Sequence, residues 1–291
     1  MWNFANFLVN GLVSGSAYVM VAVGLTLIFG ILEILQFAHG EVYMLGAYFA
    51  WTILRRYEVN YLLAVLGAML LAGVLGVVME FLCFRPLRGK PLFLPLVSAV
   101  GLSLFLTDSA RHLWSPNPEV ISTGYNRSVV RLGEIFISQQ RILVFVVAVV
   151  SIGLLYLFIH KTLIGKAMRA ASMDLEATAL MGINVDALVS ITFALGSALA
   201  AAAGALLGPI FLLVPHMGTL VGLKAFVCVI LGGFGDVRGT IVAGFLVGLA
   251  ESFTVGYVHS QLKDASTFVV LILVLLLRPS GLFGTKSGKF Y

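Results

Sequence analysis

The sequence has few charged residues for its length. Only 11% of its 291 residues are Asp, Glu, Lys or Arg, against roughly 25% in a soluble globular domain. Hydrophobic residues make up 60%, and the mean hydropathy is +1.06. One soluble core cannot bury so much apolar surface. We therefore expect an all-α polytopic membrane protein that is solvated by lipid and has no separate soluble domain.

Motifs of common catalytic and nucleotide-binding sites are also missing. The chain has no Gly-x-x-x-x-Gly-Lys-Ser/Thr loop, no Gly-x-Ser-x-Gly, no His-Glu-x-x-His and no Cys-x-x-Cys pair. Its two cysteines, Cys83 and Cys228, lie in apolar runs, and its five histidines are scattered. We expect no disulfide, no metal site, no cofactor bound by this chain and no enzymatic activity. The net charge of +5 comes from scattered basic residues, which argues against nucleic acid as a partner.

Apolar runs that could form membrane-spanning helices are the most abundant feature. They lie at about 4–29, 40–54, 61–82, 92–107, 142–160, 188–213, 219–231, 240–258 and 266–277. A spanning helix needs about 20 apolar residues, and several runs are shorter. We therefore expect eight to ten spans.

Basic residues indicate how the chain is oriented. They cluster at 85–90, at 161–169 and at 278–289, and nine passes would place these clusters on one face. Lys and Arg in short loops favour the cytoplasmic side, although Arg55 and Arg56 fall on the other face. We divide the single transmembrane domain, 1–291, into a first repeat (about 4–108), an outer loop (109–141), a linking helix (142–160), a cytoplasmic coupling segment (161–187) and a second repeat (about 188–278).

The segment 161–187, called the polar segment below, separates two apolar runs. It is too long for a tight turn, and Gly165–Met181 is suited to short helices outside the bilayer. Such a segment offers a soluble partner a place to bind.

Two further segments do not resemble simple spans. Residues 30–41 contain Glu33, His39 and Glu41, and residues 231–239 contain four glycines and a potential Asp236–Arg238 pair. The first is either an interfacial loop or a helix broken at membrane depth, and the second is either a tight cytoplasmic turn or a similar break. Irregular backbone persists in a membrane only when it is buried in protein or faces a water-filled cavity. Half-helix ends then offer peptide dipoles to a polar solute.

A weak internal repeat favours a broken helix. The matching features are Gly15-Ser16-Ala17 and Gly24 with Gly196-Ser197-Ala198 and Gly204, His39-Gly40 with His216-Met217-Gly218, and Glu80 with Glu251. Nine passes make the matched helices antiparallel, as in transporters with inverted repeats. Glu80 and Glu251 are candidate functional residues, because an acid at the centre of a helix costs roughly 2.5–3.5 kcal/mol to insert into a membrane. Arg85, five residues after Glu80, also allows a structural ion pair there.

Residues 36–48, Gln-Phe-Ala-His-Gly-Glu-Val-Tyr-Met-Leu-Gly-Ala-Tyr, resemble a family signature. The family comprises the permease subunits of branched-chain amino acid ABC importers, specifically the Liv H type, whose signature begins Asn-Phe-Ala-His-Gly-Glu. Gln36 stands in place of the usual Asn. Three further segments also fit this family: 85–88, 165–183 and 231–239.

The resemblance implies a type II ABC importer-like fold in a bacterial inner membrane. A second homologous permease subunit, two cytoplasmic ATPase subunits that bind ATP and Mg, and a periplasmic solute-binding protein would be the partners. The implied substrate pathway comprises Gln36, Phe37, His39, Gly40, Glu41, Tyr43, Phe234 and Asp236. The implied ATPase-coupling residues are Gly165, Lys166, Arg169, Asp174, Glu176, Ala177 and Gly182.

Alternative functions remain open at this point. The same architecture could import urea, short amides or another small polar solute. An ion-coupled secondary transporter could use Glu80, Glu251 or Asp236 as proton carriers. A membrane-embedded enzyme has the least support, because no catalytic cluster is visible.

Overall fold

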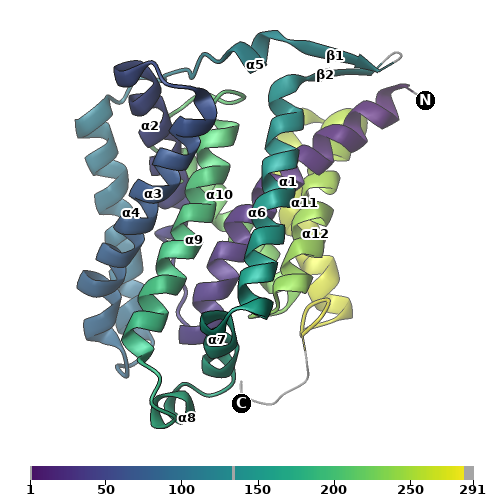
Figure 1. The fold of residues 1–291 in the computed structure, drawn as a ribbon. Helices are drawn as coiled ribbons and strands as arrows, with labels where there is room; N and C mark the ends of the chain where they lie inside the picture. The colour runs from purple at the N-terminus through teal and green to yellow at the C-terminus, as the bar shows by residue number, and fades with distance from the viewer. Residues whose placement is uncertain (1, 133–134, 285–291) are drawn as a thin grey trace.

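The computed structural model describes residues 2–132 and 135–284, and most of the described chain is helical (Figure 1). The long helices are α1 (Trp2–Leu32), α2 (His39–Tyr57), α3 (Tyr61–Met79), α4 (Phe93–Trp114), α6 (Gln139–Lys161), α9 (Val185–Leu207), α10 (Met217–Gly232), α11 (Val237–Tyr257) and α12 (Lys263–Leu277). Shorter elements are the π-turn η1 (Glu80–Phe84), the 3-10 turns η2 (Arg85–Leu87) and η3 (Ser260–Leu262), and helices α5 (Gly124–Arg127), α7 (Leu163–Met173) and α8 (Leu175–Leu180). Strands β1 (Val129–Leu132) and β2 (Ile135–Ser138) form one antiparallel hairpin. The prediction of an all-α polytopic fold is confirmed.

Every predicted apolar run contains a helix, but the helices differ in length. Within the described residues, seven are long and apolar enough to cross a membrane: those containing α1, α3, α4, α6, α9, α11 and α12. The other two are α10, which is shorter, and α2, which carries Glu41, Arg55 and Arg56. The described fold therefore combines seven full-length spans with two helices, α2 and α10, that depend on packing against the other helices.

Helices α1 and α9 form the centre of the bundle. In their most apolar windows, 89% of the α1 residues and 67% of the α9 residues are buried, against 6% for the span that contains α12. α1 packs on α11 and α10, while α9 packs on α3 and α2, and the two central helices also contact each other. Each central helix therefore packs mainly on two helices from the other half of the chain. Large apolar side chains on α3, α4, α6 and α12 are exposed on the outside, where lipid would solvate them.

Two different structures cover the opposite ends of the bundle (Figure 1). α7 and α8 lie at one end, and α5 with the β-hairpin lies at the other. The outer connection is shorter than the predicted loop 109–141, because α4 continues to Trp114 and α6 begins at Gln139. Glu119 in this connection exchanges two backbone hydrogen bonds with Leu213, at 2.9 and 3.0 Å. The outer connection therefore holds the segment that leads into α10.

Candidate functional site

The link between α1 and α2 turns back into the bundle. α1 ends at Leu32, and Glu33 adopts a positive φ of 55°. At the start of α2, the His39 Nε2 atom lies 3.1 Å from the carbonyl oxygen of Val21, near the middle of α1. α2 therefore begins beside the middle of another helix and not at the end of the bundle.

Polar residues of this link are buried in protein. Gln36, His39 and Glu41 are only 1–2% exposed, whereas Glu33 is exposed. This burial excludes an interfacial loop with solvated charges at residues 36–41. The alternative interpretation, a broken helix with its irregular backbone buried in protein, describes the geometry.

The N-termini of α2 and α10 meet in the bundle. A Cβ atom on Gly40 would lie 2.8 Å from the Gly222 Cα atom and would overlap the carbonyl oxygen of Gly218. Only glycine allows the two backbones to approach this closely. The His39-Gly40 and His216-Met217-Gly218 segments, which the sequence repeat pairs, are therefore in direct contact.

Glu41 lies where these two helix ends meet. Its Oε1 atom accepts hydrogen bonds from Ser103 Oγ at 3.1 Å and from Thr219 Oγ1 at 3.0 Å. Its Oε2 atom has no hydrogen-bond partner within the described part of the chain. A carboxylate in the first turn of a helix is stabilised by the helix dipole. Two hydroxyl groups and a helix end thus surround this acid.

Gln36 and Phe37 line a small cavity beside the junction. The cavity has a volume of about 10 Å³ and is lined by Leu25, Leu35, Gln36, Phe37, Gly222 and Phe226. Neither polar atom of the Gln36 amide has a hydrogen-bond partner among residues 2–132 and 135–284. The Phe37 ring is 5.9 Å from the Phe226 ring, and Phe37 is 36% exposed. Tyr43, one turn into α2, is buried against Gly204.

Phe234 and Asp236 are not among the residues that line this cavity. The Phe234 ring is 4.7 Å from the Phe29 ring, near the C-terminal end of α1. Asp236 accepts a hydrogen bond from the Gly239 N–H at 2.8 Å and so caps α11. Gly233 and Gly235 have positive φ, as a tight turn requires. Residues 233–236 are therefore a tight turn, and the expected Asp236–Arg238 ion pair is absent from the described structure.

The polar segment forms the two short helices at one end of the bundle. Thr162 caps α7 through the Gly165 N–H at 3.0 Å, and Asp174 caps α8 through the Ala177 N–H at 2.9 Å. α7 buries Gly165, with Met168 and Ala171 on the same face. Gly182 follows α8 with φ of 81°, the left-handed conformation that commonly ends a helix.

The polar segment presents an apolar surface outside the spans. Leu180 is 88% exposed and Met181 is 82% exposed. Lys166, Arg169, Glu176 and Ala177 are also exposed, and the Arg169 guanidinium donates to the Ile159 carbonyl at 2.5 Å. Exposed apolar side chains outside the lipid-facing surface typically mark a contact with another protein.

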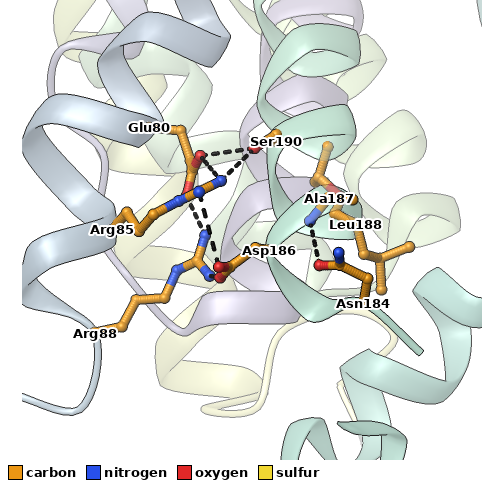
Figure 2. Close-up of polar contacts among 9 residues, drawn as sticks. Glu80, Arg85, Arg88, Asn184, Asp186, Ala187, Leu188 and Ser190 are labelled. Carbon is orange, nitrogen blue, oxygen red and sulfur yellow. Dashed lines mark hydrogen bonds and ion pairs between the residues drawn. The ribbon is translucent and has the colours of Figure 1, made fainter. Parts of the chain in front are cut away.

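An ion cluster connects the polar segment to the end of α3 (Figure 2). We use this name for Glu80, Arg85, Arg88, Asp186 and Ser190. Glu80 is fully buried and pairs with Arg85 at 3.1 Å and with Arg88. Asp186 pairs with Arg88, and Ser190 donates to Glu80 at 2.7 Å. The structure therefore gives Glu80 the structural ion pair that its spacing from Arg85 allowed.

A second buried ion pair was not anticipated from the sequence. The Lys224 Nζ atom is 2.7 Å from Glu251 Oε1 and 2.6 Å from Asp264 Oδ1. Tyr18 and Thr267 donate to Glu251 at 2.8 and 2.7 Å. The sequence signals were a lysine inside the apolar run 219–231 and the acid Glu251 inside the run 240–258, and nothing in the sequence paired them. With Glu80 and Glu251 paired to cations and Asp236 capping a helix, each acid proposed as a proton carrier has a structural role.

Buried half-helices, apolar spans and an exposed helical segment define a multi-pass membrane protein of the transport class. Within the described residues, no group of three His, Cys, Asp or Glu side chains could hold a metal ion. The family described as "Branched-chain amino acid transport system / permease component" matches residues 7–277. The chain belongs to this family of permease components.

Individual relatives align over nearly the whole chain. The high-affinity branched-chain amino acid transport system permease protein BraD of Pseudomonas aeruginosa is 37% identical, with 98% of this chain and 97% of the relative covered. The corresponding protein LivH of Salmonella typhimurium is 33% identical, with 97% and 96% covered. A probable branched-chain amino acid transport permease protein, LivH of Methanocaldococcus jannaschii, is 26% identical over 93% of this chain and 90% of the relative.

Proposed function

We propose that this chain is the membrane-spanning subunit of an ATP-driven importer for branched-chain amino acids in a bacterial inner membrane. The observation that carries the proposal is the full-length similarity to permeases whose names specify this cargo. The chain has no nucleotide-binding loop, so ATP hydrolysis would come from separate subunits. In this proposal, the exposed surface of α7 and α8 binds those ATPase subunits.

The proposed assembly has four kinds of subunit. A second homologous permease would complete the pathway, and two ATPases would bind at the end that carries α7 and α8. A periplasmic solute-binding protein would dock at the end that carries α5 and the β-hairpin. The opposite positions of these two surfaces in Figure 1 support this assignment.

In the proposed pathway, the solute passes the junction of α2 and α10. A branched-chain amino acid has a zwitterionic end and an apolar end, so it needs both dipoles and apolar walls. The Gln36 amide and the N-terminus of α2 supply dipoles, and Phe37 and Phe226 supply an apolar surface. A cavity of about 10 Å³ cannot hold an amino acid. Passage therefore requires the two half-helices to separate.

Purification from native membranes followed by uptake assays tests the proposal. We expect two ATPase subunits and a second permease to co-purify, and the complex in vesicles to take up labelled leucine when ATP and the binding protein are supplied. Uptake of urea or a short amide in place of leucine would change the cargo. Transport by the isolated chain, sustained without ATP and abolished by a protonophore, would refute the proposal.

Leu180→Glu is expected to weaken attachment of the ATPase subunits by about tenfold or more, because a charge would enter an apolar contact. Leu180→Met keeps the apolar surface and is the matched control. Glu176→Arg, also in α8, should have a similar effect. Glu58→Arg is its control and should have none, because Glu58 is exposed but follows the C-terminal end of α2. Co-purification from membranes with equal amounts of inserted permease measures the effect. Full attachment in Leu180→Glu would remove α8 from the contact.

Gln36→Leu is expected to lower the uptake rate by about tenfold, since a solute passing the cavity loses one polar contact. Attachment of the ATPases should not change, because Gln36 is buried and lies outside α7 and α8. Gln36→Asn retains an amide and should retain most of the uptake. Initial rates in vesicles provide the measurement, and normal uptake by Gln36→Leu would exclude this amide from the pathway.

A further inference from the structure

Asp186 is the last charged residue of the polar segment and also belongs to the first turn of α9. Asn184 caps this helix by accepting a hydrogen bond from the Ala187 N–H at 3.0 Å (Figure 2). Only residues 181–184 separate α8 from α9, and they include Gly182. A displacement of α8 therefore reaches α9 at the turn that carries Asp186.

The ion cluster joins this turn of α9 to the end of α3. Arg88 donates to both Asp186 and Glu80, and Arg85 donates to Ser190 at 3.0 Å. Asp186 and Ser190 are four residues apart, so they lie on one face of α9. Two carboxylates face two guanidinium groups, so the cluster is neutral. The two arginines that follow α3 therefore contact α9 at two positions, Asp186 and Ser190.

Glu80 fixes the cluster in the bundle. It begins the π-turn that ends α3, and the Arg85 N–H donates to the Glu80 carbonyl oxygen. Its side chain is fully buried, so its two cationic partners are needed to compensate the charge. α3 also packs along α2, the helix that begins at the buried junction. The contacts thus run from Asp186 through Arg88 and Glu80 to α3 and α2.

We infer that the ion cluster transmits movement of the polar segment to α3 and α2, which makes Asp186 and Arg88 positioning residues for transport. The inference rests on the proposed ATP-driven function. In this arrangement, the ATPases bind α7 and α8, while Asp186 makes α3 follow the first turn of α9. Removing the charge of Asp186 leaves the ATPase contact in place but loosens this link.

The experiment compares leucine uptake with ATP hydrolysis in the complete importer in vesicles. We expect Asp186→Asn to lower the number of leucine molecules imported per ATP hydrolysed by about fivefold or more, the usual range of coupling between sites. ATP hydrolysis and ATPase attachment should stay close to those of the unaltered complex. Asp186→Glu restores the charge and should restore most of the ratio. Arg88→Gln should lower the ratio at least as much as Asp186→Asn, because it removes the contact with Asp186 and also one of the two cations that compensate the buried Glu80.

Asp108→Asn is the matched control. Asp108 is 64% exposed, pairs with Arg111 at 3.7 Å, and is outside the cluster. The number of leucine molecules imported per ATP hydrolysed should therefore be unchanged in Asp108→Asn. An unchanged ratio in Asp186→Asn would overturn the inference alone. Loss of the ATPase subunits from Asp186→Asn would also overturn it, because Asp186 would then be a docking residue. Absence of ATP-driven uptake by the unaltered complex would overturn both this inference and the proposed function.

Discussion

Gly40→Val is expected to destabilise the protein by about 3 kcal/mol or more and to abolish uptake. The added side chain would overlap the backbone of α10 at Gly218 and Gly222. Backbone atoms cannot rotate away as a flexible side chain can, so the two half-helices would have to separate permanently. The effect is therefore larger than that of ordinary overpacking in a core.

Gly153→Val is the matched control for this change. Gly153 lies in α6, and a Cβ atom there would have no neighbour within 4 Å. The thermal unfolding midpoint in detergent and the fraction of monodisperse protein measure the difference between the two variants. Gly40→Ala should fall between them. Equal stability of Gly40→Val and Gly153→Val would show that α2 and α10 do not meet at these glycines.

The helical runs and the polar segment were predictable because their signals are local. Apolar runs long enough to span a bilayer fix the helices, and Asp174 and Gly182 mark where α8 begins and ends. The outer end of α4 was less predictable. Asp108 ended the predicted run, yet the helix continues to Trp114 because its charges pair along one exposed face. Asp108 lies 3.7 Å from both Arg111 and His112, at spacings that support a helix.

The arrangement at the broken helix depended on contacts that no local pattern contains. The signature at 36–41 indicated a break, but not that the link would turn back to Val21. Ser103 and Thr219, which hold Glu41, are ordinary hydroxyl residues on other helices. Phe234 and Phe37 were both assigned to the pathway by resemblance, but their rings contact different partners, Phe29 and Phe226. Local signals therefore indicated the break, and tertiary packing decided which residues lie beside it.

Glu251→Leu is expected to destabilise the protein by about 3–5 kcal/mol, because it leaves the Lys224 ammonium group in the core without its closest buried partner. Lys224 is 5% exposed, and Glu251 is 1% exposed. Asp264 stays in contact with Lys224, but its side chain is 52% exposed and compensates the charge less well. Tyr18 and Thr267 would also lose the acceptor of their hydrogen bonds.

The double variant Lys224→Met/Glu251→Leu should be more stable than Glu251→Leu, since replacing a whole buried ion pair by apolar side chains is often close to neutral. Asp108→Asn, which removes an exposed pair, should cost about 0–1 kcal/mol. Unfolding in detergent measures all three variants. A double variant no more stable than Glu251→Leu would contradict the pairing. If the stable double variant also retains ATP-driven uptake, Glu251 cannot be a proton carrier, and the ion-coupled alternative loses its deepest candidate acid.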